Sequence, residues 1–506
     1  MKTRLNWLLA TAAVTALSGC INLAPHYARP AAPVPASWPG AASAASAASA
    51  ASGTAAAAGA MAADIGWRTF FVDPRLQRTI ALALENNRDL RVAILDIEKE
   101  RAEYRIQRAS LFPELDLNAG DDAARTPTSV RRAEAGETQS TATSGTGETT
   151  HVYSANLGMA SYELDLFGRV RNLSNAALET YLSTIETRRA TQISLVSEVA
   201  SDWLTLASDK RLLVLAQQTL ASQQQTFALV EREHALGAAS GLDYQAARAS
   251  VQSARNAAAQ AATTAAQARN ALELVVGTVV PDADLPDAQV NPVASIERIP
   301  AGVPSTVLQQ RPDVLAAEHT LKADNADIGA ARANFFPTIS LTAALGFESP
   351  ALSSLFTGAN RAWSFEPAAT LPIFDGGANR ATLDAAKVTY KIDVANYEKT
   401  IQTAFEEVAN ALATRATIDE QLDAQLQTVD ADQRAYDLSM ALYRQGSESL
   451  LDALTEQRLL YTAQQSLVAT QLSAQTSLIE LYAALGGGLD GDNGKKPEGA
   501  VTAHSG

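Results

Sequence analysis

Side chains that could carry out catalysis or bind a metal are few and scattered in this chain. The five histidines show no metal-ligand spacing, and they are His26, His151, His234, His319 and His504. Cys20 is the only cysteine, so neither an intrachain disulfide nor a thiolate metal site can form. No phosphate-binding loop or GxSxG element occurs, and the many carboxylates lie at the spacing of solvated helix faces. We therefore expect a protein that is not an enzyme, with no metal site and no bound cofactor.

Cys20 nevertheless indicates one covalent modification. Lys2 and Arg4 precede an apolar stretch from Trp7 to Ala16, and the sequence LSGC follows at 17–20. This order is typical of a secretory signal, and the small residues before the cysteine resemble the bacterial lipoprotein box. The alternative is a stray cysteine at the end of an ordinary signal. We expect a signal peptide over 1–19 and a diacylglycerol and an N-acyl chain, such as palmitate, on Cys20.

The residues after the cysteine bear on the membrane in which the chain is anchored. Ile21 and Asn22 do not match the aspartate pattern linked with retention in the inner membrane, so the outer membrane is expected. Elsewhere the sequence lacks the roughly 18 uninterrupted apolar residues of a spanning helix, so crossing the membrane would fall to strands. The net charge of −15 argues against nucleic acid and anionic lipid head groups as partners.

Two nearly identical ten-residue segments indicate an internal tandem duplication. RASLFPELDL occupies 108–117 and RANFFPTISL occupies 332–341, each at the end of a helical pattern and the start of an alternating one. The predicted segments are a lipid-anchored linker rich in Pro and Ala/Ser over 20–63, a first repeat over 64–277, a connector over 278–312, a second repeat over 313–486 and a flexible tail over 487–506.

Each repeat is predicted to hold two strands and long helices. The first has a helix over 75–111, strands near 114–120 and 152–166 around an exposed loop over 121–150, and helices over 169–236 and 242–276. The second has strands near 338–348 and 362–373 and helices over 378–445 and 447–485. The apolar parity shifts near 160, which predicts a bulge. A helix of this length reaches on the order of 100 Å at about 1.5 Å per residue.

Four amphipathic strands are too few to close a barrel. An ordinary half-buried sheet packed on helices is the alternative, but the neighbouring helices are too long to fold back onto so small a sheet. Open edges in lipid leave unpaired backbone groups, each costing several kcal/mol. Three copies would supply twelve strands, which lies within the known range of membrane barrels. We expect a mixed α and β membrane protein that forms a homotrimer.

Several motifs resemble the TolC/OprM family of outer membrane efflux lipoproteins, including its NodT-like members. They are LSGC at 17–20, LAPHYARP at 23–30, DIGWRTFFVDPRL at 64–76, YELDLFGRVRN at 162–172, RPDVLAAE at 311–318, ANFFPTISL at 333–341 and LPIFDGG at 371–377. The resemblance implies a trimeric twelve-stranded barrel continuous with a long periplasmic helical barrel of coiled-coil character. It also implies passive conduction of small toxic compounds such as drugs or solvents, and hence antibiotic resistance.

The implied partners are outer membrane lipid, a periplasmic adaptor (membrane fusion) protein and an inner-membrane pump of the resistance-nodulation-division or a related type. Two turns between long helices would form the periplasmic tip and contact the adaptor, at Gly237, Leu242, Asp243 and Gly446. Asp243 and Asp452 could instead only cap their helices.

A gate is predicted beside the second turn. Threefold symmetry would repeat Leu451 as an apolar ring and Asp452 as a carboxylate ring. Three residues after Asp452 the family commonly has an aspartate, which would form a second, inner ring in a trimer. This chain has Thr455 there, followed by Glu456, so the charge of that inner ring differs. Arg458, together with Tyr443, could tie neighbouring helices shut.

Two helix-to-strand corners are predicted at Phe112-Pro113 and Phe336-Pro337, where proline ends a helix and phenylalanine suits the membrane boundary. The phenylalanines could instead be hydrophobic staples.

Two other functions remain open: the exit duct of a type I protein secretion system, and a lipid-anchored helical scaffold in the periplasm. The sequence does not identify the cargo, the pump or the adaptor.

Overall fold

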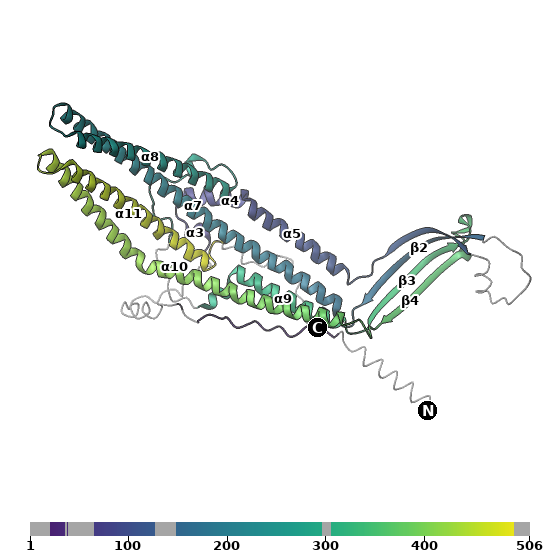
Figure 1. Cartoon of the computed structure of the whole chain (residues 1–506). Helices are drawn as coiled ribbons and strands as arrows, with labels where there is room; N and C mark the ends of the chain where they lie inside the picture. The colour runs from purple at the N-terminus through teal and green to yellow at the C-terminus, as the bar shows by residue number, and fades with distance from the viewer. Residues whose placement is uncertain (1–20, 36–37, 39–64, 127–147, 296–304, 490–506) are drawn as a thin grey trace, which may run out of the picture. The chain divides into compact units, whose positions relative to one another are not determined.

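The computed structural model describes residues 21–35, 38, 65–126, 148–295 and 305–489, drawn in colour in Figure 1. The chain divides into two compact units. One comprises residues 1–29, 98–182 and 319–394, and the other residues 30–97, 183–318 and 395–506. Each unit therefore combines segments from both predicted sequence repeats, so the repeats are not the compact units. The predicted signal peptide over 1–19, Cys20, most of the predicted linker and the end of the predicted tail lie outside the described residues.

The first unit contains one antiparallel sheet of four strands in the order β1-β2-β3-β4 (Figure 1). The strands are β1 (Asp116–Thr126), β2 (Glu148–Leu164), β3 (Thr338–Ser349) and β4 (Arg361–Thr370). The register between β2 and β3 shifts between Met159 and Tyr162. This irregularity confirms the bulge that the change of apolar parity predicted.

The strand ends correct the sequence prediction. β1 and β2 remain paired through Asp121–Tyr153 to Thr126–Glu148, so the two ends of the predicted 121–150 loop, residues 121–126 and 148–150, are a polar extension of the hairpin. Backbone pairing holds these exposed residues in strands although they lack an apolar pattern. β1 also begins at Asp116 rather than 114. β4 ends at Thr370 rather than 373, because Pro372 has no backbone N–H to give to a ladder.

Six helices of more than 20 residues account for most of the described chain. They are α5 (Arg88–Ala109), α7 (Arg169–Ala235), α8 (Gly241–Val276), α9 (Pro312–Ala333), α10 (Ala378–Arg444) and α11 (Leu450–Ala484). α11 begins at 450 rather than 447 because Ser449 is its N-cap. Shorter helices are α3 (Trp67–Phe70), α4 (Pro74–Asn86), η2 (Asp282–Asp284), η3 (Ser305–Gln310), η4 (Leu352–Ser354) and η5 (Gly358–Asn360). Among the helices described, none is both long and apolar enough to cross a membrane.

Asn87 breaks the single helix predicted over 75–111 into α4 and α5. Its side-chain oxygen accepts from the backbone N–H of Leu90 at 2.8 Å, which starts α5 as an N-cap would. Its amide nitrogen donates to the carbonyl oxygen of Val275 at 2.7 Å, near the end of α8. The break therefore comes from an asparagine that caps one helix and ties it to another, rather than from glycine or proline.

The second unit has an aromatic and aliphatic core around α3. Trp67, Phe70 and Phe71 are almost fully buried. Phe70 stacks on Tyr482 of α11, with ring centroids 3.8 Å apart, and the Tyr482 hydroxyl donates to the carbonyl oxygen of Ile65. These contacts join the segment before α4 to the end of α11, the last helix among the described residues.

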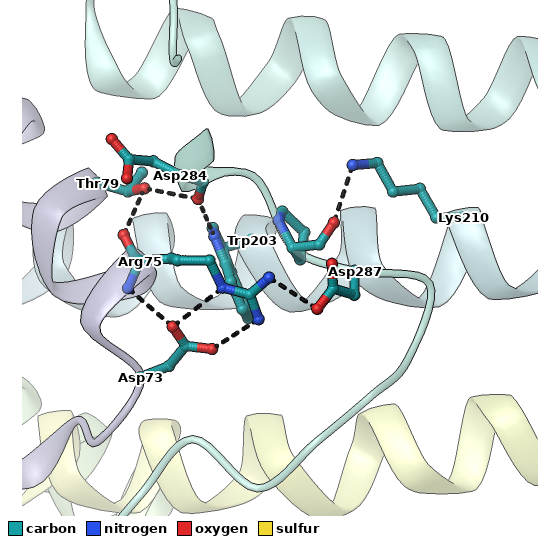
Figure 2. Close-up of polar contacts among 8 residues, drawn as sticks. Asp73, Arg75, Thr79, Trp203, Lys210, Asp284 and Asp287 are labelled. Atoms are coloured by element: carbon teal, nitrogen blue, oxygen red, sulfur yellow. Dashed lines mark hydrogen bonds and ion pairs between the residues drawn. The ribbon is translucent and has the colours of Figure 1, made fainter. Parts of the chain in front are cut away.

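A charged network beside this core fixes α4 against α7 (Figure 2). The Arg75 guanidinium contacts Asp73 at 3.1 Å and Asp287 at 2.8 Å, and it lies 5.7 Å from the ring centroid of Trp203 on α7. Trp203 Nε1 donates to the carbonyl oxygen of Asp284 at 3.0 Å. The hydrogen bond that the Arg75 guanidinium donates to the Asp73 carboxylate raises the pKa of Arg75, so the guanidinium stays charged.

Lys210 of α7 extends the same network by donating to the carbonyl oxygen of Pro286 at 2.9 Å (Figure 2). Burial lowers the pKa of Lys210, and the nearby positive charge of Arg269 adds to that effect. The segment 282–287 is thus held to α7 by a lysine and a tryptophan.

Candidate functional site

The turn between α7 and α8 is closed by a capping box. Gly237 adopts a positive φ of 78°, a conformation that favours glycine. The Ser240 hydroxyl accepts from the backbone N–H of Asp243 at 3.1 Å, and the Asp243 carboxylate accepts from the backbone N–H of Ser240 at 3.2 Å. Leu242 is highly exposed beside them. The turn thus presents an apolar side chain on a well-capped helix end.

The turn between α10 and α11 also has a glycine at positive φ followed by a capping serine. Gly446 has a φ of 73°, and Ser449 caps α11 by accepting from the backbone N–H of Asp452 at 3.3 Å. The Ser449 hydroxyl also donates to the Asp452 carboxylate at 2.7 Å. Asp243 and Asp452 therefore occupy equivalent positions, and each supports its helix start within one chain. The carboxylate ring expected of Asp452 stays a prediction, because the structure shows only its capping role within one chain.

The predicted gate residues follow the first two turns of α11. Leu451 is 62% exposed, and its carbonyl oxygen accepts from the Thr455 hydroxyl at 2.8 Å. Arg458 reaches the same hydroxyl at 3.5 Å. Leu451, Thr455 and Arg458 thus share one face of the helix, whereas Asp452 and Glu456 lie on the adjacent row. The structure brings the five residues together on one helix end.

A polar tie joins α10 to α7 near the same turns. The Tyr443 hydroxyl donates to the Glu233 carboxylate at 2.7 Å. Burial raises the pKa of Tyr443, and the bond to Glu233 raises it further, so the phenol stays a neutral donor. The sequence indicated Tyr443 as a tie, but it did not indicate Glu233 as the acceptor.

A second polar connection was missed by sequence reasoning. Gln223 of α7 donates from Nε2 to Gln457 Oε1 of α11 at 2.6 Å, and Gln457 Nε2 donates to the Ser222 hydroxyl at 3.0 Å. Ser222 also lies 3.2 Å from the Tyr436 hydroxyl of α10. Both glutamines are buried. Their position on otherwise apolar helix faces, with Val230 seven residues beyond Gln223, is the signal that could have indicated them.

Both helix-to-strand corners have the same backbone geometry. The N–H of Phe112 donates to the carbonyl oxygen of Ala109 at 2.9 Å, and the N–H of Phe336 donates to that of Ala333 at 3.0 Å. Both phenylalanines are exposed, and Phe336 also stacks on Phe167 with ring centroids 4.8 Å apart. The two predicted corners are therefore tight turns with phenylalanines at the base of the sheet.

An apolar row crosses all four strands. Leu117 pairs with Leu157, Leu157 with Leu345, and Leu345 with Trp363. Residues directly opposite one another in antiparallel strands project from the same face. All four side chains are exposed in the single chain. The sheet therefore has one face with a continuous apolar belt, which suits contact with hydrocarbon.

The first described residues of the chain lie against the sheet base and α9. The backbone N–H of Ile21 donates to the carbonyl oxygen of Leu166 at 3.2 Å, just beyond β2. Arg332 donates to the carbonyl oxygen of Leu23 at 3.0 Å. Gly329 leaves room for Ala24, because a Cβ at 329 would lie 2.8 Å from its backbone. Cys20 itself lies outside the described residues.

A pair of carboxyl groups joins α9 to α10. Asp324 shares a hydrogen bond with Asp393, and burial followed by this neighbour raises the pKa of Asp324 to about 7. Within the described part of the chain, no three acidic, histidine or cysteine side chains gather as metal ligands would.

Comparisons with known proteins agree with this arrangement. The family model described as outer membrane efflux protein matches residues 79–278 and 303–487. The toluene efflux pump outer membrane protein TtgC of Pseudomonas putida is 45% identical over 95% of both chains. OprJ, an outer membrane protein of Pseudomonas aeruginosa, is 42% identical over 93% of this chain and 94% of its own.

Solved structures show the same fold. A membrane protein from Pseudomonas aeruginosa superposes with a TM-score of 0.81 at 40% identity, covering 92% of this chain and all of that chain. The open state of the MtrE outer membrane channel of Neisseria gonorrhoeae gives a TM-score of 0.79 at 36% identity, covering 93% and 99%.

These matches confirm the predicted resemblance, the efflux function and a transport role in place of catalysis. The coverage extends over nearly the whole chain, including the strands and both tip turns. The chain belongs to the outer membrane efflux protein family.

Proposed function

We propose that three copies of this chain form one twelve-stranded barrel through the outer membrane, continuous with a helical barrel in the periplasm. The observation that carries this proposal is the pair of sheet edges. Within the described residues, β1 and β4 each pair with a strand on one side only. Unpaired edges in lipid cost several kcal/mol per backbone group, and pairing β1 of one copy with β4 of the next removes them.

The apolar row across the strands supports the same assembly. The belt runs from Leu117 on β1 to Trp363 on β4, so joining three sheets edge to edge makes it continuous around the barrel. Phe112 and Phe336 at the two corners then lie at the membrane-water boundary, where aromatic side chains are favoured.

Lipidation of Cys20 completes the attachment. Ile21 is hydrogen-bonded to Leu166 just beyond β2, so the neighbouring cysteine would carry its acyl chains close to the base of the barrel. This placement lets the lipid enter the same leaflet that the strands reach. A diacylglycerol and an N-acyl chain together provide stable anchoring, which a single chain does not.

At the periplasmic tip, Leu451 and Asp452 of three copies would form an apolar ring and a carboxylate ring that close the lumen. Thr455, Glu456 and Arg458 line the next turn, and Thr455 makes the inner ring neutral. The exposed Leu242, next to Asp243, and the two glycine turns at Gly237 and Gly446 would contact a periplasmic adaptor. Adaptor binding would bias the paired helices toward an open arrangement.

The cargo proposed is small toxic compounds, delivered by an inner-membrane pump of the resistance-nodulation-division type. The names of relatives that export toluene, solvents and antibiotics support this class. Deleting the gene should lower the minimum inhibitory concentrations of several drugs and solvents, and wild-type protein should restore them. Pull-down should recover adaptor and pump. Unchanged sensitivity to every compound in a panel of drugs and solvents would contradict the proposed cargo class.

A further inference from the structure

The loop between β3 and β4 folds back onto the face of the sheet that carries the apolar belt, hereafter the belt face. Phe347 and Ser349 follow Leu345 at every second position of β3, so all three project from this face. Ser349 is only 1% exposed. Its hydroxyl lies 2.7 Å from the Ser354 hydroxyl and donates to the carbonyl oxygen of Ala351 at 2.9 Å. Two loop residues therefore lie over a side chain of the belt face.

Phe356 makes a second contact between the loop and the belt face. Its ring meets the ring of Phe347 edge to face, with centroids 5.6 Å apart. Leu355 is buried, whereas Phe356 is 72% exposed and Leu352 is 64% exposed. A short loop thus exposes two large apolar side chains next to a sheet face that is itself apolar. Continuous apolar surface of this kind marks a contact surface.

The loop is also free of charge. No charged side chain occurs from Pro350 to Asn360, and charge resumes only at Arg361. By contrast, the segment 127–147, which connects β1 to β2, contains two arginines and two glutamates. Charged side chains are costly in hydrocarbon and are readily solvated in water. The composition of the β3–β4 loop therefore suits contact with lipid rather than with water.

The height of the loop matches the outer edge of a hydrocarbon layer. In the proposed barrel the corner at Phe336 marks the inner boundary, and β3 begins at Thr338. Phe347 is nine residues further along β3. At about 3.4 Å per residue and a tilt of about 40°, it lies about 23 Å above the start of the strand. Apolar bands of such barrels are about 25 Å tall and end in aromatic girdles, so Phe347 and Phe356 lie where the outer girdle is expected.

We propose that the β3–β4 loop, residues 350–360, inserts Phe356 and Leu352 into the outer leaflet, where they contact lipid acyl chains close to the head groups. Copies of the proposed barrel join edge to edge, so the belt face stays turned toward lipid and not toward a neighbouring copy. A loop held on this face does not cover the mouth of the barrel. The contact rests on the proposed barrel, because only a closed barrel presents the belt face to hydrocarbon.

The test places a fluorophore on single introduced cysteines of the full-length protein in lipid nanodiscs. Phe356→Cys and Leu352→Cys are labelled with a nitrobenzoxadiazole maleimide, and the wild type, which has only Cys20, gives the background. One quencher is a phosphatidylcholine with a nitroxide on its acyl chain near the head group, and the other is aqueous Co²⁺. Both loop labels should be quenched roughly 2-fold or more strongly by the lipid nitroxide than by Co²⁺, as expected of side chains at the membrane interface.

Glu348→Cys and Leu345→Cys are the matched controls. Glu348 precedes Ser349 on β3 and projects from the opposite face, so its label should be quenched by Co²⁺. Leu345 belongs to the apolar belt, so its label should respond to the lipid nitroxide.

The controls separate failure of the loop contact from failure of the barrel. If Leu345→Cys responds to the lipid nitroxide but both loop labels respond only to Co²⁺, the loop lies in water and the proposal is overturned while the barrel stands. Loop labels shielded from both quenchers would also overturn it, because protein would then cover them. A Leu345→Cys label that lipid does not quench would contradict the barrel and, with it, the loop contact.

Discussion

The Tyr443 hydroxyl of α10 donates to the Glu233 carboxylate of α7 at 2.7 Å, which joins the two helix pairs close to both tip turns. A hydrogen bond to a charged acceptor contributes about 1.5–3 kcal/mol, so this bond would restrain the opening of the proposed gate. We predict that Tyr443→Phe raises the mean single-channel conductance in planar bilayers. Tyr390→Phe, on the same helix but without this bond, is the matched control. Equal conductance of Tyr443→Phe and wild type would show that the tie does not restrain the tip.

Leu451 provides a separate test of the gate. Because it is exposed within one chain and would face its copies around a threefold axis, Leu451→Ala should widen an apolar constriction and raise conductance several-fold. Leu459→Ala removes an equally large exposed side chain eight residues further along α11 and should leave conductance unchanged. Equal effects of the two substitutions would place the constriction elsewhere.

The sequence predicted the long helices and both tip turns to within a few residues, because glycine at positive φ and a capping serine are strong local signals. It misplaced the outer parts of β1 and β2, where Asp121 and His151 are polar but paired across strands. Such pairing depends on a partner far along the chain and leaves no apolar pattern. The helix break at Asn87 was not predicted for a similar reason, since it depends on a hydrogen bond to Val275, far along the chain.

The candidate site was only partly predictable. Leu451, Asp452 and Tyr443 came from motif and position, whereas Glu233 and the Gln223–Gln457 pair are defined by contacts between helices more than 200 residues apart in sequence. Helical periodicity shows which face is buried but not which residue of another helix it meets.

Gly346 on β3 lies against the backbone of β2. A Cβ at this position would overlap the Ala155 carbonyl oxygen and Asn156, so Gly346→Val should separate two central strands and abolish the folded assembly. Gly120→Val is the control, because a Cβ at Gly120 meets only the Ser154 hydroxyl, at 3.7 Å. The measurement is the yield of heat-modifiable, protease-resistant protein in detergent micelles. A normal yield for Gly346→Val would contradict the β2–β3 register.

The Asp324–Asp393 pair predicts a pH dependence of stability. The folded pKa of Asp324 is about 7, above its ordinary value of 3.8. Between these values the folded state binds more protons than the unfolded state, so the free energy of unfolding falls as pH rises through this window. Asp324→Asn should flatten that slope and raise the unfolding temperature at pH 8.

The control for this prediction is Asp384→Asn, at an exposed carboxylate of α10. Unfolding temperatures of the wild type and both variants are compared at pH 5 and pH 8 at constant ionic strength. A wild type that is equally stable at both values, or an Asp384→Asn variant with the same flattened slope, would refute the role of Asp324.

The most direct test of the shared barrel is the protein mass of the detergent-purified complex, measured by multi-angle light scattering with the detergent contribution subtracted. The unpaired edges of β1 and β4 predict three chains per particle, retained on dilution. A particle of one chain, stable without detergent, would contradict the account.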